Sequence, residues 1–236
     1  SSDLLTLTST GSVYLEQCRS ILEQVDSAES GLAQATSSPH GRLRVGLPFA
    51  YGLQQLMPVL LDFMLEHPHI ELLTDFSDQH ANLVEEGLDI SIRITTRLAP
   101  TDVVRRLGHC RLLTLASPDY LSREGKPTTP EQLRQHACLV YGFDAQSTKW
   151  HYQGLDHKPL SVTVSGRLAS NNGVALMQAA ARGLGLTQQP DFIAAPFLAR
   201  EEVVPVLKRY QSPALGIYAV LPSNRYIPHR VNVLID

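Results

Sequence analysis

Alternating apolar segments between residues 42 and 94 constrain the fold of this chain more than any other feature. Three of them have the length and composition of buried strands: RLRVGLP, IELLTDF and LDISIRI. Two segments between them have helical spacing and end at Pro68 and Gly87: LQQLMPVLLDFMLEHP and DQHANLVEEG. The order strand, helix, strand, helix, strand predicts a parallel sheet with right-handed crossovers.

A second α/β unit is predicted between residues 119 and 211, where the same alternation is less regular. Helices are expected at PEQLRQHA and GVALMQAAARG, and strands at CLVYG, LSVTVSG, GLTQQ and VVPVL. Two segments follow without companions, the strand ALGIYAVLP and the beginning of a helix at PHRVNVLID. We therefore expect the chain to cross back and complete the first sheet with its last strand.

The composition limits the classes of partner that we expect. The 236 residues carry a formal net charge of -3, which is not the basic footprint of a nucleic-acid-binding surface. The sequence shows no secretory signal, and no apolar stretch reaches the roughly 18 to 20 residues of a membrane span. The cysteines Cys18, Cys110 and Cys138 are odd in number and lack metal-ligand spacing. We expect a cytoplasmic protein with no membrane contact, no disulfide framework, no metal and no other cofactor.

A helical seam opens the chain. Between residues 14 and 35, apolar and small residues recur at alternating steps of four and three. A seam of this kind, held over about three heptads, favours packing against another helix. Thr8, Ser9 or Thr10 can cap the helix, and the segment TSSPHG is typical of a linker after it.

Two later helices, at residues 53–68 and 173–183, are apolar on more than one side, whereas covering one face of a sheet requires only one apolar stripe. Burial inside the monomer and contact with a second subunit both explain either helix alone, and the seam favours an oligomer. The positions expected at subunit contacts are Tyr14, Cys18, Ile21, Val25, Ala28, Leu32, Leu53, Met57, Leu60, Met64, Met177 and Ala180.

Helix starts at the carboxyl ends of strands define a candidate ligand site, because helix N-termini there offer unpaired N–H groups. The residues at these places are Pro48, Phe49, Ala50, Tyr51, Thr95, Thr96, Asn171, Asn172, Gln188 and Gln189. Their polar groups suit a small polar or anionic ligand. A cap or turn role stays an alternative for any one of them, since Asn, Thr and Gly are common at such places.

The order of particular segments resembles the LysR-type transcriptional regulators. The segments are LTSTG before the long helix, GRLRVGLP, LMPVLLDFMLEHPHIEL, LVEEGLDISIRI, LASPDYL, GKPTTPEQLRQHACL, AAARGLGLT and VVPVL. Their order and spacing, from about Leu5 to the last residue, carry the resemblance. It implies a bacterial regulator with an N-terminal winged helix-turn-helix, a linker helix and a two-lobed α/β effector domain of the periplasmic-binding-protein-like (type 2) fold.

The resemblance also implies a domain organisation. Residues 1–8 are expected to be a remnant of the winged helix-turn-helix and residues 9–40 the linker helix, which pairs with that of a second subunit. Lobe I is expected at 41–116 with 214–236, and lobe II at 117–213. The DNA-reading domain is expected to be missing, so promoter DNA is a partner only through that domain. The effector is expected between the lobes of a homodimer or homotetramer.

Two candidate positions depart from the family's usual residues. Relatives commonly have glycine where this chain has Thr95, and a more apolar residue near Gln188. Both changes add hydrogen-bonding groups and are expected to alter ligand choice. Arg93 either pairs with a carboxylate ligand or makes a structural ion pair with a neighbour such as Asp89, and we favour the second.

The sequence also bears on three other kinds of function: catalysis, metal or redox chemistry, and solute transport. No nucleophile elbow, P-loop or zinc-protease motif is present, so no enzymatic activity is expected. Histidines 67 and 69 are more often exposed than metal ligands, and Trp150 more often belongs to a core cluster. A redox pair of Cys110 and Cys138 is less favoured than two small apolar core residues. The rival from another class is a free-standing solute-binding protein, which should have a secretory signal and no heptad helix.

Replacing Leu32 with aspartate tests the seam. A charge placed in a helix–helix seam loses hydration without gaining a partner, so we expect the assembly to fall to a smaller species. Light scattering on the unchanged chain and on Leu32→Asp measures the mass. A monomer in both cases would leave the seam without a partner and would favour the solute-binding alternative.

Overall fold

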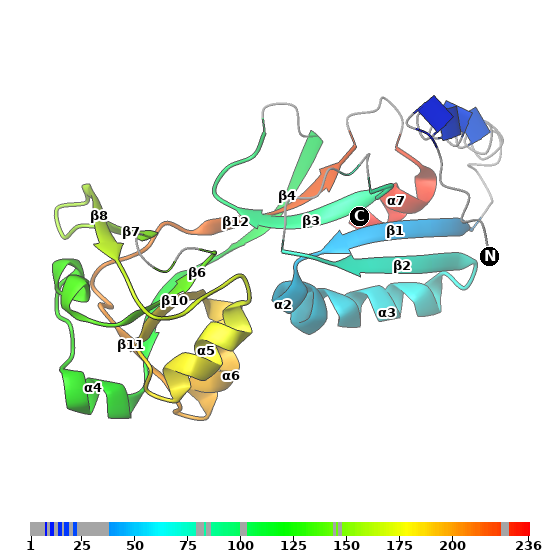
Figure 1. Cartoon of the computed structure of the whole chain (residues 1–236). Helices are drawn as coiled ribbons and strands as arrows, with labels where there is room; N and C mark the ends of the chain where they lie inside the picture. The colour runs from blue at the N-terminus through cyan, green and yellow to red at the C-terminus, as the bar shows by residue number, and fades with distance from the viewer. Residues whose placement is uncertain are drawn as a thin grey trace, which may run out of the picture. The chain divides into compact units, whose positions relative to one another are not determined.

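The structure is a computed structural model (Figure 1), and the chain divides into two compact units. One unit contains residues 1–43, 63–72 and 224–236, and the other contains residues 44–62 and 73–223. The residues that the structure describes are 8, 10–11, 14–15, 17–18, 21–22, 38–78, 83, 86–99, 103–143, 145, 148–222 and 227–236. Within these ranges no helix has the length and apolarity needed to cross a membrane.

The opening helix of the first unit is confirmed at the described positions between 10 and 22. Gly11 donates its backbone N–H to Thr8 Oγ1 at 3.1 Å, as expected for a helix cap. Tyr14 and Ile21, two of the seam positions, are 68% and 59% exposed. The seam positions outside the described residues are Val25, Ala28 and Leu32. The seam stays a prediction beyond residue 22.

The first sheet has the strand order β2-β1-β3-β12-β4. Its strands are β1 (Gly41–Leu47), β2 (Ile70–Phe76), β3 (Ile90–Thr95), β4 (Val103–Cys110) and β12 (Leu215–Leu221). β1 and β3 are parallel, as the alternating segments predict, and β12 is antiparallel to both β3 and β4. The last strand therefore returns to the first sheet as expected, while β4 was not predicted.

One helical run follows β1. It consists of α2 (Phe49–Tyr51), a π-helical turn η1 (Gly52–Leu56) and α3 (Met57–Glu66). This run confirms the predicted helix at these residues. The second predicted helix, at 78–87, lies mostly outside the described residues. The C-terminal helix α7 (His229–Ile235) is confirmed, with Val231 buried.

The second sheet has the strand order β11-β5-β10-β6-β9. Its strands are β5 (Leu112–Ala116), β6 (Cys138–Tyr141), β9 (Ala169–Ser170), β10 (Leu186–Pro190) and β11 (Val204–Val206). Helices α5 (Gly173–Ala181) and α6 (Asp191–Ala199) bury Leu176, Met177 and Ala194 in one apolar cluster with β5 and β6. These helices supply one of the two layers that the sheet needs.

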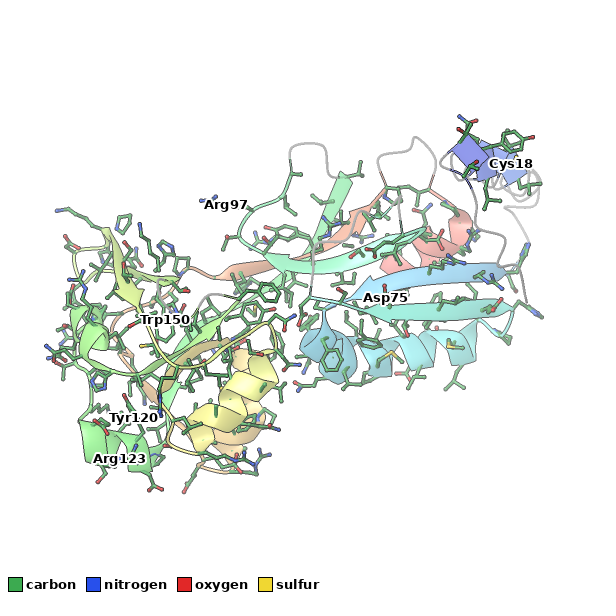
Figure 2. All side chains as sticks on the ribbon, viewed as in Figure 1. Cys18, Asp75, Arg97, Tyr120, Arg123 and Trp150 are labelled. Carbon is green, nitrogen blue, oxygen red and sulfur yellow. The ribbon has the colours of Figure 1, made fainter. Side chains whose placement is uncertain are left out.

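A two-stranded hairpin, β7 (Thr148–Gln153) with β8 (Pro159–Val164), contributes to a second cluster. Trp150, Tyr152, Val162 and Val164 are buried there with Leu186 of β10. This confirms the core interpretation of Trp150, which Figure 2 labels within this part of the fold. A short helix α4 (Pro118–Glu124) and a 3-10 helix η2 (Pro130–Gln135) complete the connections.

Three further elements differ from the sequence-based prediction for local reasons. The predicted helix at PEQLRQHA is the 3-10 turn η2, because the segment is short and begins at Pro130. α6 was not predicted, because Pro196 lies inside it and removes one backbone donor. β7 was also missed, because lysine and histidine alternate with its two buried aromatic residues.

The chain passes between the two sheets twice. It does so at Arg111, between β4 and β5, and in the segment between β11 and β12. β5 pairs with β10 and β11 and so belongs to the second sheet. The predicted lobe limits, 41–116 with 214–236 and 117–213, stay a proposal.

Burial also corrects the list of expected subunit contacts. Met177 and Ala180 are 0% exposed and Leu60 is 5% exposed in the chain alone, so they stabilise their own monomer. Leu53 remains 58% exposed and Met64 37%. Other large apolar residues of the same helical run are exposed as well, namely Val59, Leu61 and Leu65.

Truncating Met177 tests its place in the core. Met177→Ala removes a fully buried side chain and leaves a cavity, so we expect a loss of about 2–5 kcal/mol in the free energy of unfolding, independent of protein concentration. Leu155→Ala, at a position 54% exposed, is the control and should change the free energy by less than about 0.5 kcal/mol. Chemical denaturation measures both. A loss that depends on protein concentration would instead place Met177 at a subunit contact.

Candidate functional site

The predicted site residues lie where strands of both sheets end and helices begin. α2 follows β1, α5 follows β9 and α6 follows β10 (Figure 1). The pairing of β6 with both β10 and β9 is parallel, so these three strands end at one edge of the second sheet. The arrangement is the one in which open α/β sheets bind ligands.

The first N–H group of α2 is capped by Asp78, a residue that was not among the predicted site residues. Pro48 offers no side-chain cap, and the backbone N–H of Phe49 donates instead to Asp78 Oδ1 at 2.9 Å. The chain comes close here, since a Cβ on Gly52 would lie 2.7 Å from Leu47 Cβ. A proline at the cap position was the signal that some other acceptor had to serve this N–H.

Ala50 and Tyr51 pack against other parts of the chain. Ala50 is buried in the apolar cluster of α5 and α6, and the ring of Tyr51 meets Phe192 of α6 edge-on, with centroids 5.0 Å apart. Desolvation, followed by the nearby Cys110, raises the pKa of the Tyr51 phenol, so it stays protonated at neutral pH. These two residues join α2 to the helices of the second sheet.

Two threonines lie at the end of β3, and a side-chain hydrogen bond is described for only one of them. Thr95 Oγ1 donates to the carbonyl of Arg97 at 2.8 Å and accepts the Arg97 N–H at 3.0 Å. Thr95 therefore closes a turn, which is the local alternative named above. Thr96 is exposed, and no hydrogen bond of its side chain is described.

The start of α5 brings three polar residues together. Asn172 Oδ1 accepts the N–H groups of Val174 and Ala175 at 3.0 and 3.1 Å, which makes it the helix cap. Gln189, 1% exposed, approaches the same turn, because a Cβ on Gly173 would lie only 2.5 Å from its Oε1. Asn171, beside the cap, is exposed and has no described side-chain hydrogen bond.

A hydrogen-bonded chain holds Gln189 in place. Its Nε2 donates to Thr187 Oγ1 at 3.0 Å, and Thr187 Oγ1 donates to the carbonyl of Leu139 at 3.2 Å. Thr187 is 0% exposed, so the chain runs through the interior of the sheet. A buried amide held in this way fixes the packing at the start of α5.

Gln188 does not join this group. Because side chains alternate along a strand, it lies on the opposite face of β10 from Gln189. Its Nε2 donates to Ser212 Oγ at 2.9 Å, beside the buried pair of Thr114 and Tyr152, whose hydroxyls are 2.9 Å apart. Its role is structural in the layer of the hairpin.

Tyr141 is a second residue that the sequence analysis missed. It ends β6, and burial and then the charge of Asp78 raise the pKa of its phenol to about 12. Burial likewise raises the pKa of Asp78, and the Phe49 N–H lowers it. Asp78, after β2, thus bonds to Phe49 after β1, and its charge acts on Tyr141 at the end of β6. Aromatic residues at strand ends carry no distinctive sequence signal, so only the fold identifies them.

Among the described residues, neither the cysteines nor the potential metal ligands form a second candidate site. Burial raises the pKa of Cys138 to about 12, and burial with the charge of Asp191 raises that of Cys110 to about 11, so both thiols stay protonated at neutral pH. All three cysteines are free. Across the described ranges, no three His, Cys, Asp or Glu side chains form a group that would hold a metal ion.

Comparisons with known proteins agree on one family. A family model described as the LysR substrate binding domain matches residues 36–236. A relative from Haemophilus influenzae named an uncharacterized HTH-type transcriptional regulator is 32% identical over 224 residues, covering 95% of this chain and 77% of the relative.

Two solved structures have the same fold. CrgA, a LysR-type transcriptional regulator from Neisseria meningitidis, matches with a TM-score of 0.73 at 26% identity, covering 100% of this chain and 80% of that chain. The full-length structure of the Vibrio cholerae virulence activator AphB matches with a TM-score of 0.74 at 27% identity, covering 98% of this chain and 79% of that one. These matches confirm the predicted fold class, an α/β effector domain of the two-lobed periplasmic-binding-protein type.

Two neighbouring asparagines separate capping from ligand contact. Asn172→Ala removes the cap of α5 and is expected to lower the free energy of unfolding by about 1 kcal/mol. Asn171→Ala, which removes the same amide from an exposed position, should change it by less than about 0.5 kcal/mol. Thermal or chemical denaturation compares the two variants. Equal losses would contradict the assignment of Asn172 as the cap.

Proposed function

Because the chain belongs to the LysR family of transcriptional regulators, we propose that it is the ligand-sensing and oligomerising part of such a regulator. A small effector binds where β1, β3, β9 and β10 end. Subunit contacts transmit its presence to helix-turn-helix DNA-binding domains, after which the relatives are named. The observation that supports the proposal is the start of α5, where Asn172 and Gln189 are fixed by hydrogen bonds and Asn171 beside them is exposed.

The side chains open to a ligand are fewer than the predicted set. Thr95, Asn172 and Gln188 already hold hydrogen bonds within the chain, and Ala50 is buried in packing. Thr96 and Asn171 are exposed with no described side-chain bond. We propose that these two side chains contribute to the binding of a small polar molecule.

An effector changes transcription only if it binds two arrangements of the assembly with different affinity. The contact between Tyr51 and Phe192 joins α2 to α6, and the ion pair of Arg111 with Asp191, 3.1 Å, lies where the chain passes between the sheets. We propose that a bound effector shifts these contacts, with a coupling of about 1–3 kcal/mol between ligand and assembly.

Oligomerisation is proposed to use two surfaces. The first is the seam, of which Tyr14 and Ile21 are exposed. The second is the exposed apolar surface of η1 and α3, where Leu53, Val59 and Leu65 are 58%, 61% and 82% exposed. Exposed apolar residues at this density along one helix are typical of a protein contact. Two such surfaces allow a homodimer or a homotetramer.

Two other classes of function lose support. The relatives over nearly the whole chain are transcriptional regulators, so we propose neither a catalytic step nor a free-standing solute-binding protein. A regulator acts where the DNA is, and the cytoplasm remains the proposed location.

A thermal-shift screen tests the ligand-sensing function. We expect at least one small molecule from a panel of organic acids, amino acids, amines and sugars to raise the melting temperature saturably. Asn171→Ala should weaken its apparent affinity about 2- to 10-fold, the effect of one uncharged hydrogen bond, without changing the melting temperature of the free protein. Leu155→Ala serves as the surface control. A panel without a single saturable shift would contradict the function.

A further inference from the structure

The carboxylate of Asp78 lies at the start of the helical run 49–66, where an anionic ligand would be expected. Its Oδ1 accepts the N–H of Phe49 at 2.9 Å, and Pro48 supplies no side-chain cap of its own. The run continues from α2 through η1 and α3, so this is the amino end of a helix of several turns. The protein thus brings its own negative charge to N–H groups that attract anions.

No positive side chain neutralises this carboxylate within the described ranges. Asp78 makes no ion pair there, and its second oxygen has no described hydrogen bond. Burial raises the pKa of the carboxyl group, and the contact that opposes this rise is the neutral N–H of Phe49. The charge of Asp78 is therefore available to a ligand.

Accessible aromatic rings lie close to Asp78. Phe49 is 44% exposed and stands edge-on to Phe76, with ring centroids 6.1 Å apart. Tyr141, 48% exposed, comes from the end of β6 and is near enough for the charge of Asp78 to act on its phenol. A carboxylate beside accessible aromatic faces is suited to organic ammonium groups, through charge-assisted hydrogen bonds and cation–π contacts.

We propose that the effector carries an ammonium group that binds Asp78 beside the rings of Phe49 and Tyr141. The inference rests on the proposed function, because it assigns the chemistry of one end of the ligand in that same site. A ligand carboxylate at this place would face the like charge of Asp78 and would find the Phe49 N–H already taken.

An acidic group elsewhere on the ligand is compatible with this assignment. Arg97 follows β3, next to Thr96 in the sequence, and Figure 2 shows it away from α2. Its side chain is exposed and makes no described bond. Amino acids therefore belong to the class together with simple amines, whereas acids without an amino group do not.

Matched pairs of compounds test the sign of the recognised charge. Phenethylamine is compared with 3-phenylpropionate, and putrescine with succinate, with phenylalanine as the zwitterion. Isothermal titration calorimetry on the whole chain is expected to detect binding of at least one amine or of phenylalanine, and at least tenfold weaker binding of the matched acids.

Asp78→Asn keeps an oxygen acceptor for the Phe49 N–H and removes the charge, so the protein should fold with an unchanged melting temperature. We expect it to weaken the binding of the amino compound at least tenfold. Asp75→Asn is the matched control, because Asp75 is an exposed residue of β2, labelled in Figure 2, with no described contact to α2. It should leave the affinity unchanged.

The outcomes separate this inference from the proposed function. Binding of the acids in preference to the amines, or amine binding that Asp78→Asn leaves unchanged, would overturn the ammonium assignment and leave ligand sensing intact. Absence of binding by all five compounds would also overturn the assignment, while the function is then judged by the broader thermal-shift screen.

Discussion

The alternation of side chains along β10 is the constraint on which the rest of the second sheet and its site depend. Leu186 and Gln188 point to the hairpin layer, and Thr187 and Gln189 point to the layer of α5 and α6. Both layers are apolar cores, so a register shift of one residue would exchange the two sets and place amides in the wrong core. The same alternation that builds the cores therefore delivers Gln189 to the start of α5.

Sequence patterns predicted the elements whose signals are local. The strands β1, β2 and β3 and the return of β12 follow from apolar runs, and the cap at Asn172 follows from an asparagine before a helix. The patterns failed where the signal depends on partners distant in sequence. α6 contains Pro196, which argues against a helix locally, but packing of Ile193 and Phe197 on α5 compensates for the lost donor. Likewise, which face of β10 receives Gln188 is decided by strand pairing.

The site shows the same division between local and distant causes. Residue type and position correctly located the helix starts, yet the expectation of an anion assumed that their N–H groups were free. Asp78 comes from beyond the end of β2 and fills one of them, and only the sheet order, which places β2 beside β1, makes that contact possible. The charge that a helix start attracts therefore cannot be predicted from the helix alone, because a neighbouring strand can supply a charged residue there.

One helical run connects the candidate site with the candidate subunit surface. Its first residues, 49–51, hold Asp78 and Phe192, and its later turns expose Leu53, Val59 and Leu65. The π-helical turn at Gly52–Leu56 lies between these two parts, and such turns often mark functional places in helices because their hydrogen bonding departs from the regular ladder. A ligand that moves the first turn must either bend the run there or displace the later turns as a whole. Either response changes the surface that a second subunit contacts. One helix is therefore enough to connect ligand sensing with assembly.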